Sequence, residues 1–195
     1  YLELQADNED LLENSSGALS HFITDHGGDE DATWFAAGPR ELEQLREFRH
    51  AIPEAVNLYI DMKKKEGLSI TKLGTDMAVP DEQLEQTYTL YQESLEKAGL
   101  DYVMFGHIGD NHIHVNILPA SEGEYLEGKK IYTEWAKEIT SLGGTVSAEH
   151  GIGKLKTEFL SIMYGKRGIE EMRALKRVFD PGMILNPGNL FPLPC

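Results

Sequence analysis

Cysteine and positive charge are both scarce in this sequence of 195 residues. The single cysteine, Cys195, is the last residue, so no disulfide bond can form within the chain, and this usage fits a reducing compartment. Lysine and arginine number 18 against 33 aspartates and glutamates, which gives a formal net charge of −15. That balance argues against nucleic acid and anionic lipid as partners, because phosphate binding needs an excess of Lys and Arg.

Long apolar runs are also missing. No stretch approaches the roughly 18 consecutive apolar residues of a membrane-spanning helix, and no signal peptide is visible. We therefore predict a cytoplasmic protein without a membrane span, which could still reach a membrane through a partner. The sequence begins with Tyr1 rather than Met, so we expect it to be part of a longer protein. Its length is ample for one domain.

Hydrophobic periodicity predicts an α+β fold, an antiparallel sheet with helices packed mainly on one face and a helical segment at the C-terminus. Strands are expected over 1–6, 33–37 and 144–148, a hairpin over 102–119, and extended chain over 68–79. Helices are expected over 8–25, 39–65, 81–98, 123–142, 154–164 and 168–179.

Two of the expected helices carry specific signals. Asn8 is a possible N-cap for the first helix, whose inward face would hold Leu11, Leu12, Leu19 and Phe22. Pro53 lies inside the second helix and should kink or end it, because proline lacks the backbone N–H of the helical hydrogen bond.

Histidines cluster in the segment GHIGDNHIHVN, residues 106–116. Apolar and polar residues alternate at its end, so a strand would have a polar face with His112, His114 and Asn116. The preceding β-like run ends at His107, and the four residues that follow have hairpin-turn composition. A turn with an even number of residues would place His107 on the same face as the other histidines.

A second motif, AEHGIGKLK at 148–156, places Glu149 beside His150 between a β-like run and a helix. The imidazoles of His107 and His114 and the carboxylate of Glu149 are the ligand set we expect for Zn²⁺, Mn²⁺ or Fe²⁺. Such a set leaves coordination positions open for substrate, which suits catalysis. A solvated strand face is the simpler alternative, but the clustering of the histidines favours the metal site.

These motifs and the closing FDPGMILNPGNLF at 179–191 resemble the C-terminal domain of FAD-linked oxidases of the vanillyl-alcohol-oxidase type. That group includes glycolate oxidase, D-lactate dehydrogenase and D-2-hydroxyglutarate dehydrogenase. Looser matches are LREFRHAIPEAV at 45–56 and KLGTDMAVP at 72–80. The resemblance implies a ferredoxin-like cap or substrate domain over 1–143 and a segment over 144–195 that packs on an FAD-binding domain. Nothing in the sequence resembles that FAD-binding domain, so it would lie outside this chain.

The resemblance also implies individual roles. It supports the metal set and implies His150 as catalytic base, substrate contacts from Arg49, Lys72 and Asn116, and a flavin contact from Asn186. Four residues depart from the family pattern: His112, Ala148, Pro53 and Asn189. His112 stands where many relatives have Asn, so it would be a fourth ligand, a group behind the ligands or only a neighbour.

The function implied is oxidation of a small 2-hydroxy acid of the glycolate, D-lactate or D-2-hydroxyglutarate type. FAD, bound mainly by the other domain, and a divalent metal would be the cofactors. Two alternatives stay open: a flavin-independent metallohydrolase with a metal-bound water, and a non-catalytic acidic binding module in which the histidines are scaffold. The adjacent Glu149 and His150 do not match the H-E-x-x-H spacing of many metallohydrolases.

Overall fold

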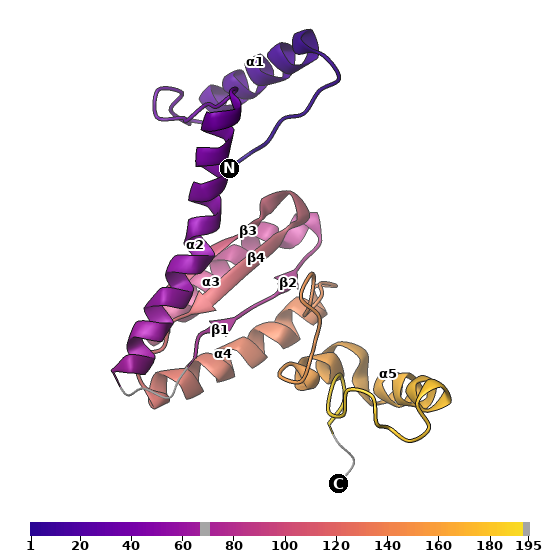
Figure 1. Ribbon diagram of the computed structural model, residues 1–195. Coiled ribbons are helices and arrows are strands. Elements are labelled where there is room, and N and C mark those ends of the chain that lie inside the picture. Colours follow the sequence, from indigo (N-terminus) through magenta and orange to yellow (C-terminus); the bar gives the residue numbers. More distant parts are fainter. Residues whose placement is uncertain (67–70, 193–195) are drawn as a thin grey trace. The chain divides into compact units, whose positions relative to one another are not determined.

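The structure, a computed structural model, describes residues 1–66 and 71–192. It contains two compact units, Tyr1–Asn57 and Leu58–Cys195. The division falls within one long helix, α2 (Pro39–Lys65; Figure 1). The boundary at residue 143 concerns which segment meets an FAD-binding domain, and it stays a prediction. Within the described ranges, no helix has the length and apolar character needed to cross a membrane.

The first unit contains helix α1 (Glu9–Asp25) and most of α2. The predicted cap is confirmed, because the Asn8 side chain accepts a hydrogen bond of 2.9 Å from the backbone N–H of Leu11. The strands predicted over 1–6 and 33–37 are wrong, since both segments lie outside any helix or strand. An alternating segment becomes a strand only beside a partner strand, and residues 1–57, all described, include none.

One further expectation for this unit is wrong, and one alternative of another is ruled out. The face of α1 with Leu11, Leu12 and Phe22 is exposed, and α1 buries no residue, because the unit has no sheet to cover that face. Of the two outcomes predicted for Pro53, an end of the helix is ruled out, because α2 runs for 27 residues from Pro39 to Lys65. Proline removes one hydrogen-bond donor, and the intact turns on both sides keep the helix continuous.

The second unit is built around strand β4 (His112–Ile117). β3 (Tyr102–His107) pairs with it on one side, and β1 (Leu73–Gly74) and β2 (Met77–Ala78) pair with it on the other, all antiparallel. The predicted antiparallel sheet is therefore confirmed. Residues 68–70 of the expected extended segment lie outside the described residues. The strand expected over 144–148 is reduced to one bridge, between Thr145 and Ala78.

The turn between β3 and β4 sets the register of the site. A 3₁₀ turn over Ile108–Asp110 and Asn111 in the left-handed region (φ 49°) bring His107 directly opposite His112. Gly106 is required beside them, because a Cβ there would collide with the backbone carbonyl of His112. The prediction that His107 shares a face with the other histidines is confirmed.

Helices cover the apolar face of this sheet (Figure 1). A 3₁₀ turn over Asp81–Gln83 leads into α3 (Leu84–Ala98), which ends at Gly99 in the left-handed conformation expected of a C-terminal glycine. α4 (Glu122–Ser141) follows β4. The shared core includes Tyr91, Leu95, Val115, Ile117, Trp135 and Ile139.

The last helix, α5 (Thr157–Phe179), consists of two helices joined at Gly165, whose φ of 64° breaks the helical conformation. Two helices were predicted here, and the first begins at residue 157 rather than 154. After α5, the buried Asp180 accepts hydrogen bonds of 3.0 Å from the backbone N–H groups of Ile184 and Leu185 and 2.9 Å from the Lys176 ammonium. The C-terminal turn is thus fixed by one carboxylate.

Candidate metal centre

Residues 147–150 lie against the polar face of the sheet beside the break between β1 and β2, where three of them donate hydrogen bonds to the Asp76 carboxylate. Between β1 and β2 the ladder is interrupted: the backbone N–H of Val115 donates to the Thr75 hydroxyl at 2.8 Å instead of to a carbonyl. The registers on both sides of the break place Asp76 opposite His114. The side chain of Asp76 therefore joins the histidine face of β4.

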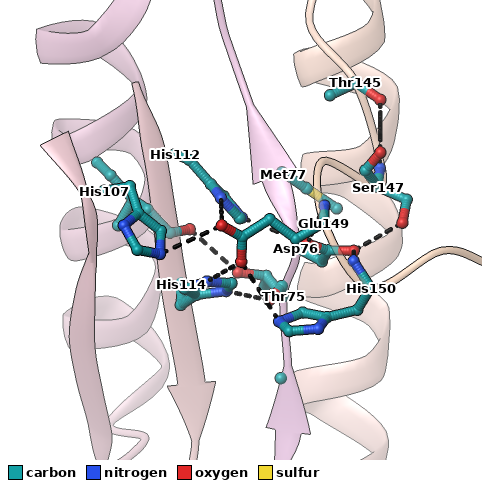
Figure 2. A network of polar contacts seen from close by, with 12 residues as sticks. Thr75, Asp76, Met77, His107, His112, His114, Thr145, Ser147, Glu149 and His150 are labelled. Carbon is teal, nitrogen blue, oxygen red and sulfur yellow. Dashed lines mark hydrogen bonds and ion pairs between the residues drawn. The ribbon is translucent and has the colours of Figure 1, made fainter. Parts of the chain in front are cut away.

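The Glu149 carboxylate lies at the centre of the site (Figure 2). Its Oε1 is 3.2 Å from His107 Nε2, and its Oε2 is 3.5 Å from His114 Nε2. The ring of His112 approaches Oε1 at 3.8 Å, and His150 Nε2 approaches Oε2 at 3.6 Å. Four imidazoles from three segments of the chain thus surround one carboxylate.

The predicted ligand set comes together in this arrangement. His107, His114 and Glu149 each offer one ligand atom, and these atoms lie within 4.8 Å of one another. Two imidazole nitrogens and a carboxylate oxygen are donors that suit Zn²⁺, Mn²⁺ or Fe²⁺. The His107 and Glu149 side chains are 38% and 41% exposed, so the open side of the group is accessible to a small molecule.

The tautomer of His114 also suits metal binding. Its Nδ1 lies 3.1 Å from the backbone carbonyl oxygen of Thr75, which can only accept a hydrogen bond. Nδ1 therefore carries a proton, and Nε2, which faces Glu149, is the ring nitrogen available to a metal. A ligand histidine held through its other ring nitrogen is the usual arrangement around protein-bound metals.

A second group of potential ligands, Asp76, His114 and His150, also lies within 4.8 Å. Asp76 is the poorer ligand, because its oxygens already accept hydrogen bonds from Ser147 at 2.6 Å and from the His150 backbone at 3.0 Å. Burial alone would raise the pKa of Asp76, but these bonds, that from the Glu149 backbone and the Lys156 charge lower it to about 2. Asp76 is therefore ionised, and its oxygens are engaged in hydrogen bonds within the chain.

His112 is the most enclosed imidazole, with its side chain 2% exposed. Burial, and then the proximity of His114, lower its pKa, while Glu149 and Asp76 oppose the shift. Its Nε2 is 3.3 Å from Asp76 Oδ1 but outside hydrogen-bond geometry, and it has no hydrogen-bond partner among the described residues. His112 is thus a neutral ring between the two carboxylates.

Comparison with known proteins identifies the family. Residues 1–190 match the family of FAD linked oxidases, C-terminal domain. The chain belongs to this family. The resemblance found in the sequence motifs is confirmed.

Three relatives of this FAD-linked oxidase domain illustrate the range of names within the family. A D-2-hydroxyglutarate dehydrogenase of Stutzerimonas stutzeri is 29% identical over 97% of this chain and 39% of its own length. The glycolate oxidase subunit GlcD of Bacillus subtilis is 34% identical over 64% of the chain and 27% of its own length. A D-lactate dehydrogenase of Anaerostipes hadrus is 37% identical over 59% and 25%, respectively. The chain therefore spans well under half the length of each.

Three more of the predicted residues of this oxidase domain belong to the second unit. His150 is exposed beside Glu149, and Asn116 is buried on β4, two residues beyond His114. Lys72 is half-buried just before β1, and burial lowers its pKa. Their catalytic and substrate-binding roles stay predictions.

Two predicted residues belong to other segments than the sheet and the 147–150 loop. Asn186 occupies a turn with φ 45°, and the N–H of Leu190 just after it donates to the carbonyl of Gly153. Arg49 belongs to the first unit, where its guanidinium lies 5.8 Å from the centre of the Tyr1 ring. The flavin contact from Asn186 and the substrate contact from Arg49 remain predictions.

Sequence reasoning missed Asp76, although a signal was present. Asp76 is the only charged residue between Leu73 and Val79, and five of those seven residues, including both ends, are buried. A carboxylate in such a segment must find several donors, because burying an unpaired charge is costly. That requirement could have pointed to the histidine face.

Proposed function

We propose that this chain is the substrate-side domain of an FAD-dependent oxidoreductase that oxidises a small 2-hydroxy acid with the help of a divalent metal. The metal would be held by His107, His114 and Glu149. The convergence of these three ligand atoms within 4.8 Å is the observation that carries the proposal. The names of the relatives, which cover dehydrogenases of D-2-hydroxyglutarate and D-lactate and a glycolate oxidase subunit, supply the substrate class.

The cofactors and the chain would divide the chemistry between them. Bound FAD would take up the hydride from the hydroxyl-bearing carbon, and a bound metal would polarise the substrate hydroxyl. His150 accepts the hydroxyl proton, because an exposed imidazole with a free ring nitrogen suits proton transfer near neutral pH. Glu149, 3.6 Å away, stabilises the imidazolium that results.

Substrate carboxylate binding would fall to cations around the site. The chain has a formal charge of −15, so local positive charge is needed to hold an anionic substrate. Lys72 and Arg49 are our candidates, with Asn116 as a hydrogen-bonding group on the histidine face. An FAD-binding domain outside this chain is the proposed partner, and the cytoplasm is the proposed location.

Family membership favours this function over the two alternatives. A metallohydrolase would use the same three ligands but would have no need of FAD. A binding module would have no need of a metal. Metal binding by the chain and flavin-dependent dye reduction by a protein that also carries the FAD-binding domain separate the three.

Titration of the chain with Zn²⁺ or Mn²⁺ tests the metal site. We expect about one saturable site per chain, and an affinity that falls by more than roughly 100-fold in His114→Ala, since loss of a ligand exceeds the 10–100-fold typical of supporting residues. His50→Ala is the control, because His50 is exposed on α2 and outside both ligand groups. Equal affinities for His114→Ala and His50→Ala would overturn the assignment.

A further inference from the structure

We propose that Asp76 is a positioning residue, which holds the segment with Glu149 and His150 against the histidines of the sheet. This inference rests on the proposed metal-dependent function and deepens it. Asp76 lies at the break between β1 and β2 and its side chain is 1% exposed. It thus belongs to the sheet, while the residues it binds belong to the loop before α5.

The carboxylate of Asp76 accepts hydrogen bonds from four groups of that loop. The Ser147 hydroxyl donates at 2.6 Å and the Lys156 ammonium at 3.3 Å, both to Oδ2. The backbone N–H of Glu149 donates to Oδ1 at 3.1 Å, and that of His150 to Oδ2 at 3.0 Å. Figure 2 shows Asp76 beside Ser147, Glu149 and His150.

The backbone of Asp76 adds to this attachment. Its carbonyl accepts the N–H of Ala148 at 2.9 Å, so one residue binds three consecutive N–H groups of the loop, from Ala148 to His150. The loop itself forms no strand beyond the bridge at Thr145. Asp76 therefore fixes the position of residues 148–150 relative to the sheet.

Glu149 depends on this attachment because its own side chain is weakly held. Its side chain is 41% exposed, and its contacts are approaches of 3.2 to 3.8 Å to the ring nitrogens of the four imidazoles of the site. A ligand carboxylate must be kept within a fraction of an ångström of its position. The two N–H bonds to Asp76, one on Glu149 and one on His150, supply that constraint from the backbone.

Two acceptor oxygens are needed at this position, and only a carboxylate supplies both. Both oxygens of Asp76 act as acceptors only, and the Lys156 ammonium compensates the charge. An asparagine would present an NH₂ group to one side, so that at least one of the donors would face another donor. Asp76→Asn should therefore loosen the loop while it preserves the size of the side chain.

Asp180 offers a matched control. It is also buried, also accepts two backbone N–H groups of the following turn, and also pairs with a lysine, Lys176. It contributes to neither group of potential ligands. Asp180→Asn should destabilise the chain in the same manner without moving Glu149.

The test compares wild type, Asp76→Asn and Asp180→Asn by Zn²⁺ titration and by amide hydrogen exchange at Glu149 and His150. We expect Zn²⁺ affinity to fall by roughly 10–100-fold in Asp76→Asn and by less than about twofold in Asp180→Asn. Exchange at the two amides should be slow in wild type and faster only in Asp76→Asn. Unchanged exchange and affinity in a folded Asp76→Asn, or an equal loss of affinity in Asp180→Asn, would overturn the proposal.

Two measurements keep the test decisive. If Asp76→Asn does not fold, Ser147→Ala removes one donor and should raise exchange at Glu149 and His150 with a smaller loss of affinity; no change in either quantity counts against the proposal. If wild type binds no Zn²⁺, the proposed metal site fails, while amide exchange still decides whether Asp76 holds the loop.

Discussion

The two faces of β4 differ in chemistry although all six of its residues are buried. Ile113, Val115 and Ile117 on one face pack into the core beneath α3 and α4. His112 and His114 on the other face meet Asp76 and Glu149. One strand thus separates a surface that stabilises the fold from one that assembles a site.

Burial has a different meaning on each face. On the apolar face it removes hydrocarbon from water, which is favourable in proportion to the area covered. On the histidine face it removes polar groups from water, which is unfavourable unless each finds a partner. Asp76 and Glu149 lie against the two histidines of this face, although Nε2 of His112 has no hydrogen-bond partner among the described residues. Substitutions on the two sides should accordingly affect different measurements.

The largest effect is expected on the histidine side and in activity. In a protein that also carries the FAD-binding domain, His150→Asn should lower kcat by roughly 10²–10⁴ because the proton acceptor is lost, with a smaller change in KM. The unfolding free energy should stay within about 0.5 kcal/mol, since His150 is exposed. A kcat within a few-fold of wild type, measured where chemistry limits the rate, would assign the base to another group.

The next effect is expected on the apolar side and in stability. Trp135 is 1% exposed, stacks at a tilt on Tyr91 with ring centres 4.5 Å apart, and donates to the Ser94 hydroxyl at 2.9 Å. Trp135→Ala should lower the unfolding free energy by about 3–5 kcal/mol, as measured by urea unfolding. Zn²⁺ affinity of the folded fraction should be unchanged. A loss of affinity as large as that of His114→Ala would show that the two faces are coupled.

The same contrast explains how far the sequence predicts the structure. The period of two in β4 and the helical period of α4 predicted both elements, because each has a continuous apolar face to bury. The convergence of His107, His114 and Glu149 was also predicted and is seen in the structure. The hairpin register places His107 opposite His112, and the hydrogen bonds from the Glu149 and His150 N–H groups to Asp76 bring Glu149 beside the histidines.

What the sequence did not predict depends on distant partners. The segment 33–37 has strand-like residues, yet it forms no strand, and Trp34 and Phe35 are exposed. Residues 1–57 include no strand with which it could pair. Asp76 was overlooked because its donors come from residues 147–156, about 70 to 80 positions later. A local pattern can show that a segment needs partners, but it does not say which distant residues supply them.

A smaller effect is expected where the two faces meet. The Thr75 hydroxyl accepts the Val115 N–H at 2.8 Å in place of a carbonyl. Thr75→Val keeps the shape but leaves that buried N–H without an acceptor, so the unfolding free energy should fall by about 1–3 kcal/mol. Thr75→Ser, which keeps the hydroxyl, is the control and should be milder. If Thr75→Val is as stable as Thr75→Ser, the hydroxyl does not support the break between β1 and β2.

The smallest effects should appear in the pH dependence of stability, and the two faces should respond at opposite ends of the scale. Burial lowers the pKa of His112 in the folded chain. The unfolded chain, in which histidine titrates near pH 6.5, therefore binds a proton at His112 more tightly than the folded chain does. The contribution of His112 to stability is complete above about pH 6.5 and is lost as the pH falls below that value. Burial raises the pKa values of Tyr91 and Tyr132 on the helical side, so their contribution is lost as the pH rises above about 10.

Urea unfolding of the metal-free chain across pH, with one variant for each face, measures the two arms separately. His112→Asn should flatten the acid arm and leave the alkaline arm unchanged, and Tyr91→Phe should do the reverse. The Tyr91 hydroxyl has a weak acceptor, the Met77 sulfur at 3.7 Å, so Phe loses little else. If the acid arm has the same slope in His112→Asn as in wild type, the pKa of His112 is not lowered in the folded chain. The charges of Asp76 and Glu149 would then offset the effect of burial on that pKa.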